Sequence, residues 1–428
     1  MLILVINSGS SSLKYQVRDV PAGQMRPEGS APAEDAMQPD GAEDPIQPGG
    51  ALKSAGAVQS EETMQSGAAM QSADAVLAEG LVERIGEDGG PADHAAAMEQ
   101  VTGDLGPVLH GRKLDAVGHR VVHGGERFSA PVLINNEITR AIERLNPLAP
   151  LHNPANVLGI RAITTMWPHM PQVAVFDTAF HRTLPEYAWR YAIPDSLYRN
   201  YGIRRYGFHG TSHEYVSHRA AELLGIPLGE FDAVIAHLGN GASITAIRGG
   251  ASIDTSMGFT PLEGLVMGTR SGDIDPSILL FLERQGMDTD EVDSMLNRES
   301  GLKALAGNND MRSIVEAAEA GDEKAQLALE VASYRLAKYI GGYHVAVGGA
   351  QALVFTAGIG ENSAQFRSLV VQRLGALGVR LDDDANCSRG KEPRVISAPD
   401  SAIPVLVVPT DEERAIAEAT AQLVHAEP

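Results

Sequence analysis

Short runs of consecutive apolar residues recur along the chain and alternate with longer amphipathic stretches, which is typical of an α/β protein. A run in which every residue is apolar predicts a strand that is buried on both faces of its sheet. Each run ends in small or polar residues, and open α/β sheets bind ligands at the carboxyl ends of their strands. The runs therefore predict five strands with a binding site at their ends: Leu2–Ile6, Val173–Phe176, Ala233–Ala236, Ala352–Phe355 and Ile403–Val408.

Two of these runs continue through a tight polar turn into a second strand, at residues 5–14 and again at residues 235–245. Their similarity predicts a duplicated domain whose two hairpins face each other across a cleft. The backbone N–H groups of such Gly- and Ser-rich turns can hold phosphate oxygens, although a solvated turn is the alternative for either hairpin alone. The motifs GxxxxGK[ST] and GxGxxG are absent, so the sequence does not support the common Walker-type or dinucleotide-binding folds.

Residues 21–75 differ in composition from the rest of the chain. They contain no aromatic residue and carry nine acidic and two basic side chains. Such a segment cannot bury enough apolar area to offset the entropy that it would lose on ordering. We expect a disordered acidic insertion here, with an acidic docking segment as the alternative.

The composition of the whole chain limits its partners and its location. The 428 residues, of which 43 % are hydrophobic, suffice for two domains. The 34 basic and 55 acidic residues give a formal net charge of −21, which argues against nucleic acid or an anionic membrane as the main partner. No apolar run is long enough to span a membrane, and the N-terminus does not resemble a signal peptide. Because Cys387 is the single cysteine, no internal disulfide can form, and we expect a cytoplasmic protein.

Two arginines, Arg120 and Arg270, lie in glycine-flanked turns. Glycines let the backbone approach a ligand closely, and a guanidinium group pairs with carboxylates and phosphates. A surface ion pair is the alternative for either arginine, but the two glycine-rich contexts favour an anionic ligand.

The histidines His209 and His213 are four residues apart, a spacing found in zinc sites on helices. The glutamate that serves as general base in such sites is missing, and Gly210 is expected to disfavour a helix. We therefore expect the two histidines to donate hydrogen bonds to an anion instead of binding zinc.

Carboxylates follow two of the predicted strands. Asp177 comes directly after the strand at 173–176, where it could bind Mg²⁺ through water or orient a substrate. Glu412 follows the strand at 403–408, where an acidic helix start is the alternative.

Nine motifs are spread over nearly the whole chain outside residues 21–75. They are Asn-Ser-Gly-Ser-Ser-Ser-Leu-Lys (7–14), Gly-His-Arg-Val-Val-His-Gly-Gly-Glu (118–126), Ala-Pro-Leu-His-Asn-Pro (149–154), Phe-Asp-Thr-Ala-Phe-His (176–181), Tyr-Gly-Phe-His-Gly-Thr-Ser-His (206–213), His-Leu-Gly-Asn-Gly (237–241), Met-Gly-Phe-Thr-Pro-Leu-Glu-Gly (257–264), Met-Gly-Thr-Arg (267–270) and Ala-Gly-Ile-Gly-Glu-Asn (357–362). In this order they resemble the acetate kinase family. No single motif is decisive, but nine motifs that occur in the order of the family are highly specific.

The resemblance implies the actin-like ATPase fold: two duplicated α/β (ribonuclease H-like) domains with a nucleotide cleft between them. It divides the chain into an N-terminal domain, 1–178, completed by the C-terminal helix 411–428, and a C-terminal domain, 179–410, with the nucleotide and dimer surfaces. It further implies reversible phosphoryl transfer from ATP to acetate, giving ADP and acetyl phosphate. Mg²⁺ is the implied metal, with Mn²⁺ as a substitute, and a homodimer is the implied assembly.

The resemblance also assigns site residues by their motifs. It gives Asn7 and Glu412 to the metal and labels Asp177 catalytic, with His209 and Arg270 stabilising the transition state. The acetate site that it implies consists of Arg120 with an apolar pocket of Val122, Leu151, Phe208 and Pro261. The nucleotide-binding residues that it implies are Lys14, His237, Leu238, Gly239, Asn240, Gly241, Asp310, Met311, Arg312, Gly358, Ile359, Gly360, Glu361 and Asn362. One departure from the family pattern is Asp411, which adds a negative charge beside the metal position where Asn is usual.

The charges of the substrates suggest what these residues do. Acetate is already ionised at neutral pH, because its pKa is close to the ~4 of a side-chain carboxyl. Asp177 is therefore not expected to act as a general base, and orienting an arginine or a metal-bound water is its expected role. Positioning and charge stabilisation are the main catalytic tasks in such a transfer. A propionate kinase with the same chemistry and a non-catalytic actin-like ATPase are the alternatives.

Overall fold

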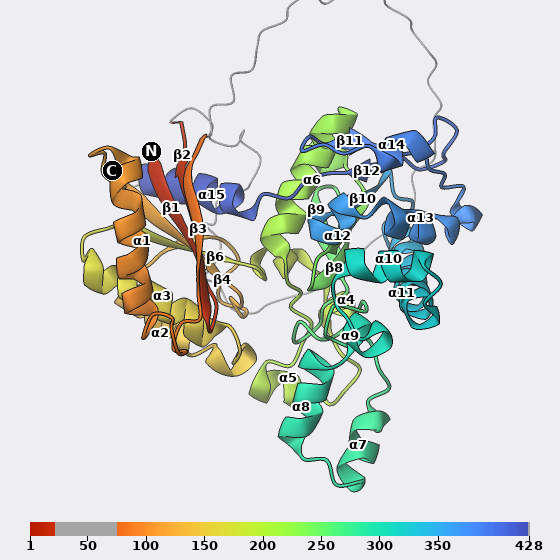
Figure 1. The fold of residues 1–428 in the computed structure, drawn as a ribbon, viewed down its shortest axis with the longest axis horizontal. Helices are drawn as coiled ribbons and strands as arrows, with labels where there is room; N and C mark the ends of the chain where they lie inside the picture. Colours follow the sequence, from red (N-terminus) through yellow and green to blue (C-terminus); the bar gives the residue numbers. More distant parts are fainter. Residues whose placement is uncertain (22–74, 427–428) are drawn as a thin grey trace, which may run out of the picture.

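The computed structural model describes residues 1–21 and 75–426 and contains two six-stranded mixed sheets with helices on both faces (Figure 1). The predicted acidic insertion at 21–75 lies, apart from its two end residues, outside the described residues. The strands are β1 (Leu2–Ser8), β2 (Ser12–Asp19), β3 (Ala75–Glu83), β4 (Ala116–Val121), β5 (Val132–Leu133), β6 (Gln172–Phe176), β7 (Ala233–Leu238), β8 (Ala242–Arg248), β9 (Ala251–Thr255), β10 (Ala352–Thr356), β11 (Arg394–Val395) and β12 (Val405–Val407).

The helices follow the strands in βα units. They are α1 (His94–Leu109), α2 (Asn136–Glu143), α3 (Asn153–Met166), α4 (Glu186–Trp189), α5 (Asp195–Tyr201), α6 (Gly210–Leu224), α7 (Ser277–Arg284), α8 (Thr289–Arg298), α9 (Gly301–Ala306), α10 (Met311–Glu319), α11 (Glu323–Ala346), α12 (Ala357–Asn362), α13 (Ala364–Gln372), α14 (Asp383–Cys387) and α15 (Glu412–Ala426). Among the described residues, no helix is long and apolar enough to cross a membrane.

The two sheets have the same topology. The first has the strand order β3-β2-β1-β4-β6-β5, and the second has the order β9-β8-β7-β10-β12-β11. In each sheet the first three strands in sequence pair antiparallel, the next two long strands add in parallel, and a two-residue strand pairs antiparallel at the edge. This identity confirms the predicted duplication, and all five predicted strands are present.

Strand β1 shows why the predicted strands are apolar throughout. Leu4 and Ile6 belong to the core formed with α1 and α3, whereas Ile3 and Val5 belong to the core formed with α15. Successive side chains of a strand point to opposite faces, so a sheet that is covered on both sides needs an apolar residue at every position. The second sheet is built likewise, with α11 and α13 covering one face and α6 the other.

The C-terminal helix α15 packs on the first sheet although the strand that precedes it, β12, belongs to the second (Figure 1). Its close approach requires a glycine in β4: a side-chain carbon at Gly118 would lie 2.5 Å from Thr420 Oγ1 and 2.7 Å from a methyl carbon of Ile416. The chain between β12 and α15 therefore crosses from one sheet to the other, and it carries Glu412 with it.

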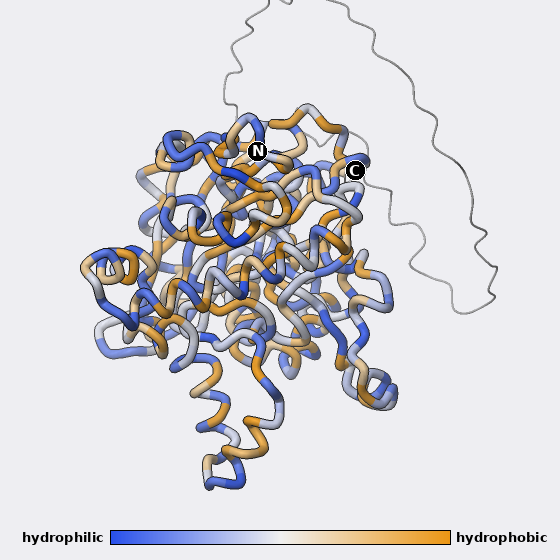
Figure 2. The backbone as a smooth tube through the Cα atoms, turned by 90° about the vertical axis from the view of Figure 1, so that its right-hand side faces the viewer, coloured by the Kyte–Doolittle hydropathy of each residue, from blue (hydrophilic) through white to orange (hydrophobic). Residues whose placement is uncertain are grey.

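Helices α7 and α8 project from the body of the molecule (Figure 1 and Figure 2). The sequence of α7, Ser-Ile-Leu-Leu-Phe-Leu-Glu-Arg, is largely apolar, yet no residue of this helix is buried. Ile278, Leu280 and Phe281 are all largely exposed.

Candidate active site

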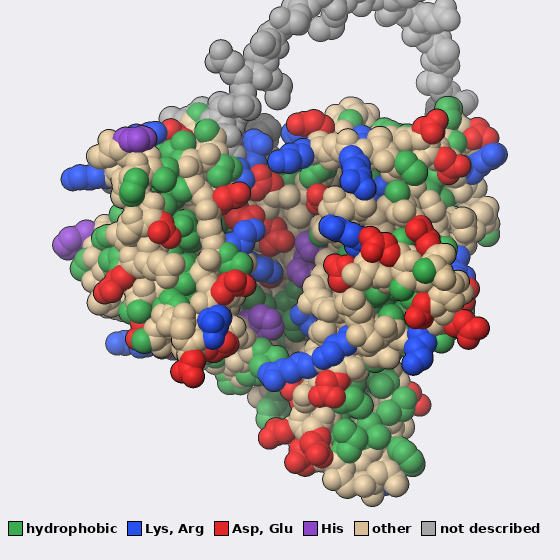
Figure 3. Space-filling view, in the orientation of Figure 1, with side chains coloured by type: hydrophobic (Ala, Val, Ile, Leu, Met, Phe, Trp, Pro, Cys, Tyr) green, Lys and Arg blue, Asp and Glu red, His purple; other side chains and the backbone are tan. Residues whose placement is uncertain are grey.

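A hollow opens between the two lobes, and positively charged, acidic and histidine side chains gather in it (Figure 3). Arg120 lies near the end of β4, Asp177 follows β6, His237 lies near the end of β7 and Glu412 comes after β12. The apolar runs predicted β6, β7 and β12, whereas β4 was not among the predicted strands. Arg120 interacts electrostatically with Glu412, and also with His209 and His237 of the second unit. The polar ends of strands from both sheets therefore meet in one site.

Arg120 and Asp177 form the best-defined ion pair of the site. Arg120 Nε donates to both carboxylate oxygens of Asp177 at 3.0 and 3.2 Å, and Nη2 donates to Oδ2 at 2.7 Å. Only 1 % of Asp177 is exposed. Burial alone would lower the pKa of Arg120, but the carboxylates of Asp177 and Glu412 outweigh it and raise that pKa. Arg120 is thus a fixed cation, and within the described part of the chain its Nη1 has no hydrogen-bond partner and can hold another anion.

Glu412 lies at the start of α15, with Oε2 3.7 Å from Arg120 Nε. Burial and the nearby carboxylates of Asp177 and Glu413 raise the pKa of Glu412, although Arg120 and Lys14 act in the opposite direction. Burial is the largest cause of the raised pKa, and a divalent cation beside this buried carboxylate would favour its ionised form. Among the described residues, no group of three His, Cys, Asp or Glu could hold a metal by itself. Mg²⁺ commonly takes only one or two carboxylates and completes its shell with water and phosphate, which fits this donor set.

The charge that Asp411 adds beside Glu412 is paired within the protein. Arg18 Nη2 lies 2.6 and 2.7 Å from the two carboxylate oxygens of Asp411, and Arg18 is almost fully buried in β2. The departure from the family pattern is therefore neutralised and also ties α15 to the first sheet.

Arg270 is in a different situation from Arg120. Its Nη1 donates to the carbonyl of Pro261 at 3.0 Å and approaches Met267 Sδ at 3.6 Å. Within the described part of the chain, no carboxylate lies at ion-pair distance, and burial lowers the pKa of Arg270. A partly buried guanidinium group without a carboxylate is ready to bind an anion.

His209 occupies the N-cap of α6 with φ = 58°, a left-handed conformation that is rare for residues other than glycine. Its Nδ1 lies 2.9 Å from Ser243 Oγ, and its ring stacks on His237 at 4.1 Å between centroids. Burial and the nearby His237, Arg120, His213 and Arg270 all lower the pKa of His209. The imidazole is therefore neutral at physiological pH and can donate only one N–H.

The start of α6 corrects one expectation from the sequence. Gly210 does not prevent a helix, because α6 begins at Gly210 and contains His213. Glycine destabilises helix interiors, but here a side chain at the first position would collide with the backbone of Asp177 and with Phe180. His209 stands outside the helix, so the two histidines do not share a helix face.

The predicted apolar pocket is brought together in part. Val122 and Phe208 are buried in the same apolar cluster, and Pro261 is held by Arg270. Leu151 lies at a turn before α3 and is 47 % exposed.

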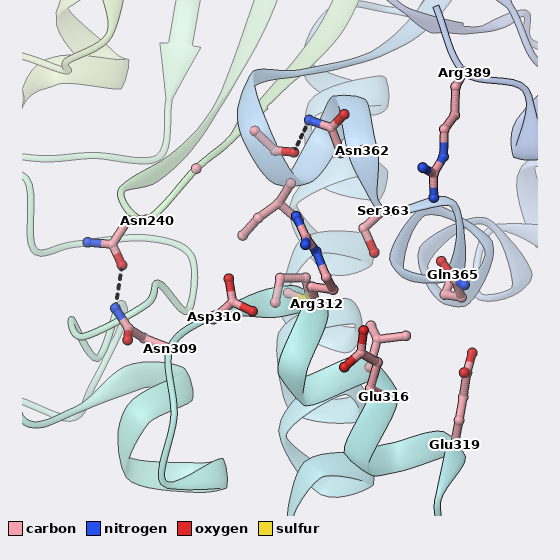
Figure 4. A pocket seen from close by; sticks show the side chains of 15 residues that line it. Asn240, Asn309, Asp310, Arg312, Glu316, Glu319, Asn362, Ser363, Gln365 and Arg389 are labelled. Atoms are coloured by element: carbon pink, nitrogen blue, oxygen red, sulfur yellow. Dashed lines mark hydrogen bonds between the residues drawn. The ribbon is translucent and has the colours of Figure 1, made fainter.

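A cavity of about 830 Å³ collects residues from the three predicted nucleotide stretches (Figure 4). Gly239 and Asn240 come from the β7–β8 turn, Asp310 to Arg312 from the start of α10, and Gly358, Ile359 and Asn362 from α12. Asn309 Nδ2 donates to Asn240 Oδ1 at 3.0 Å, and Asn362 Nδ2 donates to the Gly358 carbonyl at 2.8 Å. His237, Leu238, Gly241, Gly360 and Glu361 flank these segments without lining the cavity.

Asn7 and Lys14 lie opposite each other in the β1–β2 hairpin. The ammonium group of Lys14 pairs with Glu413. Neither residue lines the 830 Å³ cavity, because the hairpin belongs to the other sheet.

Several side chains that the sequence analysis did not single out support this site. His152 interacts electrostatically with Arg270, Arg120 and Asp177, and burial lowers its pKa. Asn156 donates to the Ser8 carbonyl at 2.8 Å and accepts from the Val122 amide at 3.1 Å, which links the first hairpin to the end of β4. His152 stands in the quoted motif at 149–154, so a signal for it was present, whereas nothing local marks Asn156.

Comparisons with known proteins cover nearly the whole chain. The model of the acetokinase family matches residues 2–418. The acetate kinase of Arthrobacter sp. (strain FB24) is 68 % identical over 434 residues, covering 99 % of this chain and 99 % of that protein. The structure of Porphyromonas gingivalis acetate kinase is similar with a TM-score of 0.82 and 39 % identity, over 99 % of both chains. A propionate kinase structure from Francisella tularensis subsp. tularensis SCHU S4 gives a TM-score of 0.80 and 39 % identity, over 98 % of both chains.

Proposed function

The chain belongs to the acetokinase family and is a kinase that transfers phosphoryl groups between ATP and acetate, and we propose that the transfer takes place between the two sheets with the roles given below. The observation that carries this proposal is the contrast between the two arginines. Arg120 is held in place by Asp177, whereas Arg270 has no carboxylate partner among the described residues and lies near the neutral His209. The anionic acceptor needs an arginine that is held in place, as Arg120 is. The transferring phosphoryl group needs an arginine without a carboxylate partner, and among the described residues Arg270 has none.

The nucleotide would occupy the 830 Å³ cavity, with its phosphates directed toward the hollow between the lobes. Its volume is in the range of ~300–1,000 Å³ that small-molecule sites usually have. The turns at 237–241 and 7–14 supply backbone N–H groups for phosphate oxygens, with Lys14 as an added positive charge.

Acetate would bind to Arg120, with Val122, Phe208, Pro261 and the exposed Leu151 around its methyl group. Asp177 accepts from Nε and from one N–H of Nη2, so the acetate carboxylate would accept from Nη1 and from the second N–H of Nη2. Asp177 then acts by fixing the direction of the guanidinium group and has no proton to remove, since acetate is ionised.

Arg270 and His209 would stabilise the phosphoryl group in flight. Arg270 can pair with its equatorial oxygens, and a neutral imidazole N–H can donate to the same oxygens. A stabilising arginine of this kind contributes ~10³–10⁵ in rate.

Glu412 and Asn7 would hold Mg²⁺, directly or through water. The ion neutralises charge on the β- and γ-phosphate oxygens when it is bound. This role fits the raised pKa of Glu412, since a nearby cation would favour the ionised form of its buried carboxylate.

Acetate is favoured over propionate as the substrate, because a relative as similar as 68 % is named an acetate kinase. The propionate kinase structure shares this fold at 39 % identity, so the fold by itself does not distinguish the two. A non-catalytic actin-like ATPase would have no use for Arg120 beside an apolar pocket.

The assembly and the domain limits belong to the same proposal. The exposed apolar residues of α7 fit a surface that a second copy would cover in a homodimer. The two domains would be 1–178 with α15 and 179–410, and the protein would act in the cytoplasm.

The decisive assay traps acetyl phosphate with hydroxylamine. The enzyme with ATP, Mg²⁺ and acetate should form hydroxamate at a steady rate, and omission of acetate should abolish it. ATP hydrolysis that is independent of acetate, without hydroxamate, would instead favour the alternative of an actin-like ATPase that does not phosphorylate acetate. A comparison of kcat/KM for acetate and propionate tests the acyl preference.

A further inference from the structure

The hydroxyl group of Ser243 lies between two buried histidines. Ser243 Oγ is 2.9 Å from His209 Nδ1 and 2.8 Å from His213 Nε2. A hydroxyl has one proton, so it can donate to one of the two nitrogens and must accept from the other. Both histidines are neutral, because burial and neighbouring histidines lower their pKa values. Two arrangements of the protons are therefore possible, and they place the single N–H of His209 on opposite sides of its ring.

The other nitrogen of His213 decides between the two arrangements. His213 is fully buried, and its Nδ1 has no hydrogen-bond partner in the described part of the chain. A buried N–H without an acceptor is rarer and less favourable than a buried lone pair without a donor. The proton of His213 is therefore on Nε2 and is donated to Ser243 Oγ. Ser243 in turn donates to His209 Nδ1, which leaves the proton of His209 on Nε2.

His209 Nε2 lies on the same side of the turn at Gly241 as the guanidinium group of Arg270. A side-chain carbon at Gly241 would lie 3.5 Å from His209 Nε2 and 3.6 Å from both terminal nitrogens of Arg270. The hydrogen bond between Nδ1 and Ser243 Oγ fixes which way the ring of His209 faces, and the ring also stacks on His237 with an interplanar angle of 18°. The Nε2 atom and the guanidinium group of Arg270 thus converge on the turn at 239–241.

We infer that Ser243 and His213 are positioning residues that fix the tautomer of His209, so that Nε2–H is presented as a donor beside Arg270. The inference rests on the proposed role of His209 toward the phosphoryl group. With the opposite tautomer, Nε2 would present a lone pair to an anionic oxygen and repel it. The hydrogen bonds from His213 to Ser243 and from Ser243 to His209 therefore decide whether His209 Nε2 attracts or repels an anionic oxygen.

The test measures the tautomer directly in the full-length enzyme. In protein labelled with ¹⁵N-histidine, long-range ¹H–¹⁵N correlations distinguish a protonated Nε2 from a protonated Nδ1, and the His209→Gln variant assigns the signals. We expect wild-type His209 to carry its proton on Nε2. Ser243→Ala should shift His209 toward the other tautomer and lower kcat about 10–100-fold, with KM for ATP changed less than about twofold.

Two further variants separate positioning from packing. Ser252→Ala is the matched control, because Ser252 is also buried and lies 2.9 Å from a histidine, His181, whose other nitrogen is bound to the Phe208 carbonyl. It should lower the melting temperature about as much as Ser243→Ala while kcat stays within about twofold. His213→Gln keeps an N–H donor for Ser243 and should retain the tautomer and most of kcat, whereas His213→Leu should lose both.

A wild-type His209 protonated on Nδ1 would overturn the inference, as would an unchanged tautomer in Ser243→Ala. The proposed role of His209 fails separately, if His209→Ala leaves kcat unchanged whatever the spectrum shows.

Discussion

Arg270→Ala should abolish most of the activity and hardly change the stability of the fold. In the structure the guanidinium group donates to one protein carbonyl, that of Pro261, and to no carboxylate of the described chain. The loss of such a hydrogen bond costs about 1 kcal/mol of folding free energy, and removal of a partly buried charge offsets part of it. The melting temperature should therefore fall by no more than ~2–4 °C.

The effect on the reaction should be much larger. If Arg270 stabilises the transferring phosphoryl group, its removal should lower kcat by roughly two to four powers of ten, which is ~3–5 kcal/mol of transition-state stabilisation. KM for ATP should change less, because the nucleotide cavity does not include Arg270. Arg270→Lys should recover only part of the rate, since an ammonium group lacks the planar fork of the guanidinium.

Arg120→Ala is the matched contrast. It removes a guanidinium group of the same size but leaves the buried carboxylate of Asp177 and the nearby Glu412 without their cation. Breaking such a pair costs ~3 kcal/mol or more, so this variant should lose stability as well as acetate binding. The assays are steady-state kinetics with acetate and ATP varied separately, together with thermal unfolding of both variants. The reasoning is refuted if Arg270→Ala changes only KM for acetate, or if it destabilises the protein as much as Arg120→Ala does.

Four further predictions concern other parts of the molecule. Val122→Ala enlarges the apolar pocket, so the ratio of kcat/KM for propionate over acetate should rise several-fold. The upper limit of this change is set by the ~1–3 kcal/mol that one methylene contributes in a pocket. An unchanged or lower ratio would show that Val122 does not line the acyl site. Glu412 has a raised pKa in the folded protein, so its ionisation costs stability as the pH rises above the ordinary value of 4.5. Glu412→Gln should therefore raise the melting temperature of the metal-free protein more at neutral pH than near pH 4.5, and it should abolish activity. A lower melting temperature of the variant at neutral pH would contradict the raised pKa of Glu412. Because Asp19 pairs with Ala75 across β2 and β3, a short Gly-Ser linker in place of residues 22–74 should leave kcat and the melting temperature nearly unchanged; a large loss of either would show that this segment is needed. Phe281→Asp, on the exposed apolar face of α7, should convert a dimer into monomers in analytical ultracentrifugation, and a dimer that persists would place the interface elsewhere.

The strands and turns of this protein could be predicted from the sequence because their signals are local. A strand that is covered on both faces must be apolar at nearly every position, and β1, β6, β7 and β10 can be recognised from such apolar runs. The two hairpin turns could be recognised as a pair because both join two strands through a short Gly-rich polar segment, which is also a local signal. The pair predicted the duplication that the matching strand orders confirm. The order of the motifs was sufficient to indicate the family.

The pairing of charges could not be predicted, because it depends on residues that are distant in sequence. The sequence predicted similar glycine-flanked turns for Arg120 and Arg270, but Arg120 lies within β4. Among the described residues only Arg120 of the two meets a carboxylate, 57 residues further along the chain. Asp411 looked like an unbalanced charge until the fold placed Arg18, 393 residues away, against it.

The protonation of His209 is likewise a property of the tertiary structure. Its sequence context, between Phe208 and Gly210, indicates neither a left-handed N-cap nor a neutral ring. Burial sets the charge, and a serine from β8 and a histidine from α6 fix the position of the proton. Sequence patterns specify which backbone segments form and where polar residues gather, because those follow from short-range periodicity. Which nitrogen bears a proton and which cation is free for a substrate follow only from the distances that folding creates.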